Sequence, residues 1–190
     1  GLDAVDLAGG DTTRGPLSIT VTAIGMVPSG RALRRDGARV GDMVCVTGTL
    51  GDAAATLSGI DSVAIAMRLY RPEPRVAAGA LLREHASAAI DVSDGLLADL
   101  GHVCAASNVG ADLRDDLLPA SEALLAAVPD AGIRLRHQLG GDDYELCLCL
   151  PPDNVTAAIE ALAAVGVPLH VIGRVAAEPG VRLRTADGTL

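Results

Sequence analysis

Short apolar runs alternate with stretches of helical periodicity along this chain. Strands are predicted at residues 43–47, 87–92, near Ala111, and at 144–150, 169–173 and 181–183, because each run is apolar or alternating over strand length. A further strand is predicted from Leu17 to Val27, where apolar residues alternate with Ser and Thr. Helices are predicted from near Gly51 to Pro72, and at 75–84, 94–107, 120–128 and 154–165. This order predicts an α/β or α+β layered domain.

Two of the predicted helices have a clear apolar stripe. In the helix at 94–107 the inward residues are expected to be Leu96, Leu97, Leu100, Val103 and Cys104. In the helix at 154–165 they are expected to be Val155, Ile159, Leu162 and Val165.

The composition narrows the classes of protein that fit. The chain is 49% apolar, yet it contains two Tyr, no Phe and no Trp, so Ala, Val, Leu and Ile must build the core. The net charge of −9, without a basic stripe, argues against binding to nucleic acid. There is no apolar run of about eighteen residues, so no membrane span is expected. Four cysteines without zinc spacing are expected to be buried thiols, with Cys147 and Cys149 on one strand face, which suits a cytoplasmic protein.

Candidate chemistry first appears where the strand at 87–92 turns into the next helix. The run Asp91-Val92-Ser93-Asp94-Gly95-Leu96 places two carboxylates and a hydroxyl at that turn. Amide groups at a helix start favour anions, and carboxylates bind Mg²⁺, so a magnesium-bound phosphate fits here. The alternative is that these residues only cap the helix, since Ser and Asp are preferred caps.

Two more segments combine a glycine pair with acids before an apolar run. They are Gly9-Gly10-Asp11-Thr12-Thr13-Arg14-Gly15-Pro16 and Gly140-Gly141-Asp142-Asp143-Tyr144-Glu145-Leu146. Paired glycines allow close approach to phosphate, and the adjacent acids can hold cations that neutralise phosphate charge. Ordinary turns are the alternative for each segment taken alone.

Several motifs, in their order along the chain, resemble the thiamine-monophosphate kinase family. They are GGDTTRGPLSITVTAIG, GRALRRDGARVGD, VTGTLGDAAA, RPEPRV, AAIDVSDGLLADLGH and GGDDYELC. This family belongs to the superfamily of aminoimidazole-ribonucleotide synthetase and selenide water dikinase. The resemblance implies direct, magnesium-assisted phosphorylation of thiamine monophosphate by ATP, which yields thiamine diphosphate in the last step of its biosynthesis. It also implies a homodimer.

The resemblance further implies an organisation in two domains. Residues 1–28 are expected to be the last strand of an N-terminal ATP-binding domain, residues 29–39 a linker, and residues 40–190 the C-terminal domain of the aminoimidazole-ribonucleotide-synthetase-like fold. A full-length family member is expected to extend beyond this chain at both ends. This fragment alone is therefore expected to be inactive.

Residue roles follow from the resemblance, position by position. Magnesium ligands are expected at Asp11, Asp91 and Asp94. Contacts to ATP are expected from Gly10, Asp11, Arg35 and Ser93. Asp142 stands where the family usually has a glutamate that contacts the substrate.

The expected acceptor is a phosphate, which is already deprotonated, so no general base is expected. The sequence has no GxxxxGK[ST] loop, which excludes a P-loop kinase. Two alternatives stay open. One is another ATP-using enzyme of the same superfamily, and the other is an inactive module that binds metal or supports a dimer.

Overall fold

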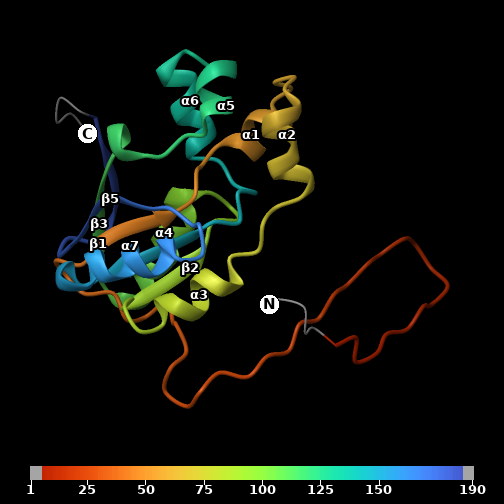
Figure 1. The fold of residues 1–190 in the computed structure, drawn as a ribbon, viewed down its shortest axis with the longest axis horizontal. Helices are drawn as coiled ribbons and strands as arrows, with labels where there is room; N and C mark the ends of the chain where they lie inside the picture. Colours follow the sequence, from red (N-terminus) through yellow and green to blue (C-terminus); the bar gives the residue numbers. More distant parts are fainter. Residues whose placement is uncertain (1–5, 186–190) are drawn as a thin grey trace. The chain divides into compact units, whose positions relative to one another are not determined.

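The computed structural model describes residues 6–185 and divides the chain into two compact units, with a boundary between Ala32 and Leu33. The unit from Leu33 onward contains all helices and strands of the described residues (Figure 1). Residues 1–5 of the predicted N-terminal remnant and 186–190 of the predicted C-terminal domain lie outside the described residues.

The first unit corrects one prediction. Residues 17–27 do not form a strand, and Leu17, Ile19 and Ile24 are between 83% and 93% exposed. Alternation of apolar and polar residues gives a strand two faces, but a strand also needs a neighbour for its N–H and C=O groups. The six-stranded sheet of the described residues does not include this segment.

A six-stranded sheet forms the centre of the second unit. Its spatial order is β2 (Ala88–Asp91), β4 (Leu146–Leu150), β1 (Met43–Thr47), β5 (Leu169–Ala176), β3 (Gly110–Arg114) and β6 (Gly180–Arg184). The pairings are antiparallel except that of β3 with β6, which is parallel. The predicted strands of this unit are therefore confirmed in position.

The helices connect these strands. They are α1 (Asp52–Leu57), α2 (Val63–Tyr70), α3 (Val76–Leu82), α4 (Leu96–Ser107), α5 (Glu122–Ala127), α6 (Ala131–Gln138) and α7 (Val155–Ala163), with short 3₁₀ turns at Asp115–Leu117 and Pro152–Asn154. The sequence reading did not predict α6, because Ile133 and Leu135 are the only large apolar residues among its eight. The cap that starts it is Asp130, whose carboxylate accepts a hydrogen bond from the Ile133 amide at 2.8 Å.

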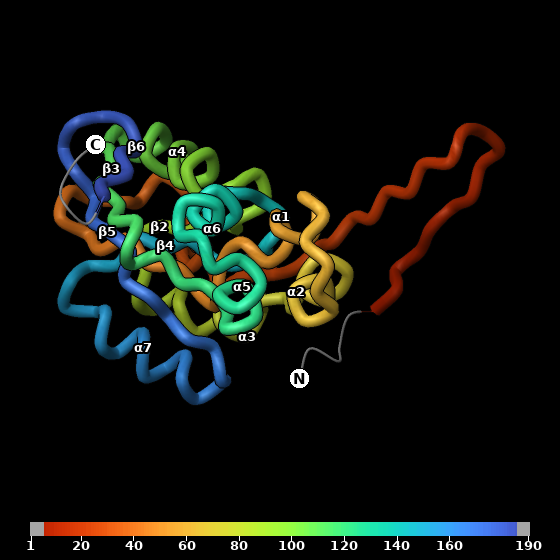
Figure 2. Tube along the Cα trace, turned by 90° about the horizontal axis from the view of Figure 1, so that it is seen from above, coloured from red at the N-terminus to blue at the C-terminus, as the bar shows by residue number. Residues whose placement is uncertain are grey.

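Helices cover both faces of the sheet, as Figure 2 shows, with α4 on one side and α7 on the other. The core on the α4 side includes Leu96, Leu100, Val103 and Cys104 together with Val44, Val46, Cys147 and Cys149. The core on the other side joins Leu148 and Leu150 to Ala78 and Leu82 of α3 and to Ala158 and Leu162 of α7. The predicted stripe of α4 is thus largely confirmed, and so are the buried thiols that share one face of β4.

The predicted stripe of α7 is wrong at two positions. Ile159 and Val165 are 40% and 42% exposed, whereas Ala158 and Leu162 are fully buried. The small side chain of Ala158 lets the helix pack closely on the sheet, which turns Ile159 outward. Val165 lies beyond the last helical residue, Ala163.

A third, smaller core lies at one end of the sheet (Figure 1). It joins Ala55 of α1, Ile65 of α2 and Leu124 of α5, with Val128 just after that helix. From the same group of helices, Arg68 of α2 forms an ion pair with Glu145, just before β4.

Part of the predicted linker belongs to the second unit. The Ala89 amide donates to the Arg34 carbonyl at 3.0 Å, and Ala38 is buried in the core. Within the described part of the chain, no helix is both long and apolar enough to cross a bilayer.

Candidate functional site

Two of the three acidic motifs meet at one edge of the sheet. Strands β2 and β4 are antiparallel neighbours, with Asp91 opposite Leu146. The loop that leaves β2, residues 91–95, therefore lies beside the loop that enters β4, residues 140–145. We call these the β2–α4 loop and the β4-entry loop.

Backbone hydrogen bonds join the two loops. The Ser93 carbonyl accepts from the Asp142 amide at 2.9 Å, and the Val92 carbonyl accepts from the Tyr144 amide at 2.9 Å. The Val92 amide in turn donates to the Glu145 carbonyl at 2.8 Å. Each loop thus fixes the backbone of the other.

Glycines allow this close approach. A Cβ atom on Gly141 would lie 2.2 Å from the Ser93 carbonyl oxygen, and one on Gly95 would lie 2.6 Å from the Leu139 carbonyl oxygen. Gly95 also has a φ of +120°, a conformation that favours glycine. Gly95 and Gly141 therefore allow contact between the two segments.

The two carboxylates of the β2–α4 loop do not cap α4. The N-cap residue is Gly95, and Asp94 lies before it rather than in the first helical turn. Asp91 and Asp94 are exposed, and neither carboxylate is hydrogen-bonded to another described residue. The capping alternative is therefore excluded for both residues, and their oxygens are open to a ligand.

The amides at this helix start have a partner from within the chain. One oxygen of Asp99, a residue of the first turn of α4, accepts hydrogen bonds from the amides of Ser93, Asp94 and Gly95 at 2.9, 3.0 and 3.1 Å. These three amides, which precede the first helical residue Leu96, therefore face Asp99, and the expectation of an anion at the first-turn amides stays a prediction. The sequence reading missed Asp99, and the capping acid in the first turn of a predicted helix was the available signal.

Asp142 and Tyr144 bring a third carboxylate and a phenol to the same edge. Both residues have positive φ, +66° and +52°, which is rare outside glycine and is a form of backbone strain that concentrates at functional sites. The Tyr144 hydroxyl donates to Asp142 at 3.3 Å. The charge of Asp142, together with partial burial and the charges of Asp91 and Asp94, raises the pKa of Tyr144.

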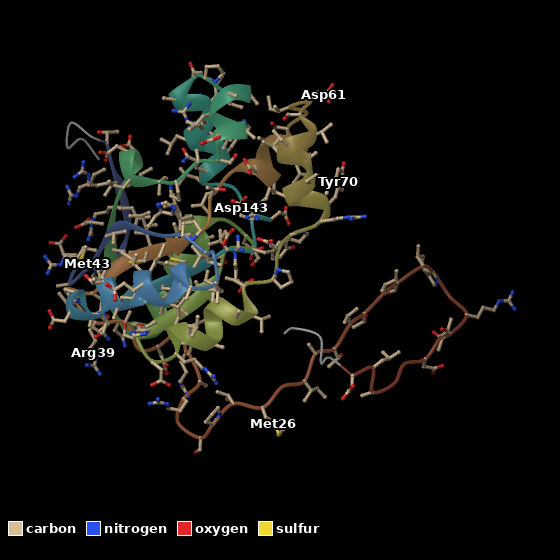
Figure 3. The ribbon with its side chains drawn as sticks, viewed as in Figure 1. Met26, Arg39, Met43, Asp61, Tyr70 and Asp143 are labelled. Atoms are coloured by element: carbon tan, nitrogen blue, oxygen red, sulfur yellow. The ribbon has the colours of Figure 1, made fainter. Side chains whose placement is uncertain are left out.

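Asp143, which lies between Asp142 and Tyr144 in the sequence, points into the protein instead (Figure 3). One carboxylate oxygen accepts from the Gly51 amide at 2.9 Å, while the other is buried and has no partner among the described residues. Burial, with a smaller contribution from the charge of Asp52, raises the pKa of Asp143 to about 7.

Glu145 is fully buried and holds two arginines. Its carboxylate accepts from Arg75 Nε at 2.8 Å, Arg75 Nη2 at 2.7 Å and the Thr47 hydroxyl at 2.7 Å, and it also pairs with Arg68. This network links the β4-entry loop to β1, to α2 and to the segment before α3. This role of Glu145 is not predictable from the sequence, because burial of a glutamate is not visible there.

The remaining predicted site residues lie elsewhere. The Arg35 carbonyl accepts from the Ser107 hydroxyl, at the last residue of α4, whereas the acids lie at the start of that helix, about 18 Å away for twelve residues. The Arg35 side chain is exposed. Gly10 and Asp11 belong to the first unit, where Asp11 accepts from the Thr12 amide at 2.7 Å.

The donor set at the loop edge suits a hard cation, because carboxylate oxygens are the ligands that Mg²⁺ prefers. Within residues 6–185, no group of three or more His, Cys, Asp or Glu is arranged to hold a metal ion. The open carboxylates of Asp91 and Asp94 fit two of the ligands of such an ion, and the predicted third, Asp11, belongs to the other unit.

Fold and loops together define a class of protein. Residues 39–186 match the family model described as AIR synthase related protein, C-terminal domain, and the chain belongs to this family. The predicted fold class is thereby confirmed.

Within that family, the resemblance to thiamine-monophosphate kinase is confirmed. The kinase of that name from Salmonella typhimurium strain LT2 is 47% identical over 185 residues, which cover 92% of this chain and 57% of the relative. The solved structure of the thiamine-monophosphate kinase from Stenotrophomonas maltophilia K279a has a TM-score of 0.79 and 42% identity, and covers 86% of this chain and 55% of that one.

A third relative, AaThiL, is solved in complex with AMPPCP and TMP. It has a TM-score of 0.66 and 29% identity, and covers 83% of this chain and 52% of that one. The chain thus spans about half the length of the relatives that it matches.

Proposed function

We propose that the full-length protein containing this chain is a thiamine-monophosphate kinase, a transferase that uses ATP to convert thiamine monophosphate into thiamine diphosphate. The observation that carries the proposal is the pair of open carboxylates, Asp91 and Asp94, on a loop fixed by a second acidic loop. Kinases of this name among the relatives, one solved with AMPPCP and TMP, support the choice of substrates.

The reaction must bring together two polyanions. Like unit charges about 4 Å apart repel by roughly 4 kcal/mol at an effective dielectric constant of about 20, and several such pairs would prevent attack. Magnesium, when bound, would offset this repulsion and stabilise the phosphoryl group in transfer. In this proposal Asp91 and Asp94 are two of its ligands, and Asp11 keeps the metal role that its sequence motif implies.

The other residues bind and orient the substrates. Ser93 is proposed to contact ATP from the sequence motif, and its backbone is held by Asp99 of α4 and by the Asp142 amide of the β4-entry loop. Asp142 is proposed to contact thiamine monophosphate. Gly10, Asp11 and Arg35 keep their proposed contacts to ATP from the sequence motifs, and the homodimer is part of the same proposal.

Substitution of the two acids tests the proposal. In the full-length protein, Asp91→Asn and Asp94→Asn each keep the size of the side chain but remove a charge. Turnover of thiamine monophosphate, followed by coupled ADP release, is expected to fall more than tenfold, equivalent to about 1.4 kcal/mol of barrier or more.

The matched control is Asp61→Asn, at an exposed residue between α1 and α2 (Figure 3), which should leave turnover unchanged. Turnover within tenfold of the unsubstituted enzyme for either loop variant would show that the residue is not a metal ligand. Turnover with another acceptor and none with thiamine monophosphate would favour a sister enzyme of the superfamily.

A further inference from the structure

The β2–α4 loop owes its shape to a residue outside both acidic motifs. Asp99 is 3% exposed, and its carboxylate lies beneath the loop at the start of α4. One of its oxygens accepts hydrogen bonds from the three consecutive amides of Ser93, Asp94 and Gly95. Hydrogen bonds from amides to a charged carboxylate are about twice as strong as those between neutral groups.

These bonds complete the restraint of the loop. The Ser93 amide is held by Asp99 and its carbonyl by the Asp142 amide, so this peptide segment is fixed from both sides. Val92 is held through both its amide and its carbonyl by the β4-entry loop. Asp91 and Asp94 thus extend from a backbone that is restrained at each residue between them.

The same bonds limit which groups of the loop can contact an anion. Three consecutive backbone amides that converge on one point form a concave site that ordinarily binds an anion. Here the Asp99 carboxylate fills that position, so a phosphate cannot reach these amides without displacing it. Asp91 and Asp94 are the exposed carboxylates of the loop, and their oxygens suit a cation.

We propose that Asp99 is a positioning residue for the metal site. By accepting hydrogen bonds from the amides of Ser93, Asp94 and Gly95, it sets the spacing between the carboxylates of Asp91 and Asp94. This inference rests on the proposed metal role of those two acids. Groups that orient metal ligands typically change metal affinity about 10- to 100-fold when they are substituted.

Two substitutions separate geometry from charge. Asp99→Asn keeps an acceptor oxygen in the same place but removes the charge. Asp99→Glu keeps the charge but moves the acceptor by one methylene group. Positioning predicts that the Asn variant retains metal affinity within about threefold and that the Glu variant loses at least tenfold. Simple attraction by a nearby charge predicts the opposite order.

Binding of Mn²⁺ to the full-length protein, measured by electron paramagnetic resonance, provides the readout without any turnover. Asp130→Glu is the matched control, because Asp130 also caps a helix, α6, and its substitution should not change Mn²⁺ affinity. If Asp99→Glu does not fold, Asp99→Ala takes its place, since it removes the acceptor altogether. Urea unfolding of each variant identifies the folded ones.

The outcomes are distinct. Equal Mn²⁺ affinity in the Glu and control variants would overturn the positioning role, and so would an Asn variant as weak as the Glu variant. Absence of Mn²⁺ binding in the unsubstituted protein would instead contradict the proposed metal role of Asp91 and Asp94. The expected order, with Asn near the unsubstituted protein and Glu far below it, supports the inference.

Discussion

At the scale of single residues, Gly141 lies in close contact with the backbone of the β2–α4 loop. We expect Gly141→Ala to destabilise the protein by about 1–3 kcal/mol, because the new methyl group would lie 2.2 Å from a backbone oxygen of Ser93 that cannot move freely. Urea unfolding measures the change. Gly101→Ala is the control. A methyl group in that position of α4 meets no atom outside the helix within 4 Å and should stabilise by about 0.5–1 kcal/mol. Equal effects of the two changes would contradict the close approach of the loops.

The raised pKa of Asp143 predicts how the free energy of unfolding changes with pH. Its pKa is raised from 3.8 to about 7 in the folded protein, so between about pH 4 and pH 7 the folded state holds a proton that the unfolded state has lost. Stability from this group is therefore lost as the pH rises through that window and is constant above it. Each pKa unit corresponds to about 1.4 kcal/mol.

The variant Asp143→Asn removes this titration. The free energy of unfolding, measured by urea at pH 4.5 and 7.5, should fall by a few kcal/mol less in this variant than in the unsubstituted chain. Asp61→Asn, at an exposed residue, should follow the unsubstituted chain. The same dependence on pH in all three proteins would show that Asp143 is not protonated near neutral pH.

Residue chemistry was only partly predictable from the sequence. The motif with Asp91 and Asp94 was visible because glycine, acids and an apolar run coincide there. The role of Glu145 was not recognised, since it depends on burial and on partners as distant as Thr47, 98 residues away. Asp99 has partners only four to six residues away, but its burial beneath the loop is not visible in the sequence. The inward orientation of the Asp143 side chain was not predictable either, because its neighbour Asp142 is oriented differently.

At the scale of elements, Glu145 connects the β4-entry loop to α2 and to the segment before α3. We expect Glu145→Gln to destabilise the protein by about 3–5 kcal/mol, because it leaves Arg68 and Arg75 without their buried counter-charge. Urea unfolding provides the measurement. Glu178→Gln is the control, since the Glu178 side chain is 88% exposed and its pair with Arg182 should contribute about 0–1 kcal/mol. A loss below 1 kcal/mol for Glu145→Gln would mean that the network contributes little to folding.

Elements of the second unit were predictable where the apolar pattern was long or flanked by clear breaks. β1 and α4 show this, and the position of α3 follows from Pro72 and Pro74. The helix α6 was not predicted because its pattern is mostly polar. The inward face of α7 was predicted incorrectly, because the small Ala158 faces the sheet instead of the larger Ile159. Periodicity alone does not reveal which of two adjacent apolar residues lets a helix pack closely.

At the scale of the whole molecule, the two units should differ in their resistance to protease. In this chain, trypsin is expected to cut first at Arg14, because residues 6–32 contain no helix or strand and Arg14 is exposed. The second unit should persist, since it contains the three described cores. Mass spectrometry of a time course identifies the first cut. An early cut between Met43 and Arg184 would contradict this division.

The order of domains was predicted from the family resemblance, and the division into 1–28, 29–39 and 40–190 stays a prediction. Whether residues 17–27 form a strand could not be inferred from their own pattern, because strand pairing depends on other segments. The site is a similar case, since Asp11 and the loop acids lie in different units.

The burial of the four thiols has a practical consequence. Cys45, Cys104, Cys147 and Cys149 all lie in the interior, and burial raises the pKa of each, so little reactive thiolate is available at neutral pH. A cysteine introduced at a surface position such as Glu178 would therefore react alone with a maleimide dye. The chain can carry a single fluorescent reporter without removal of any native sulfur.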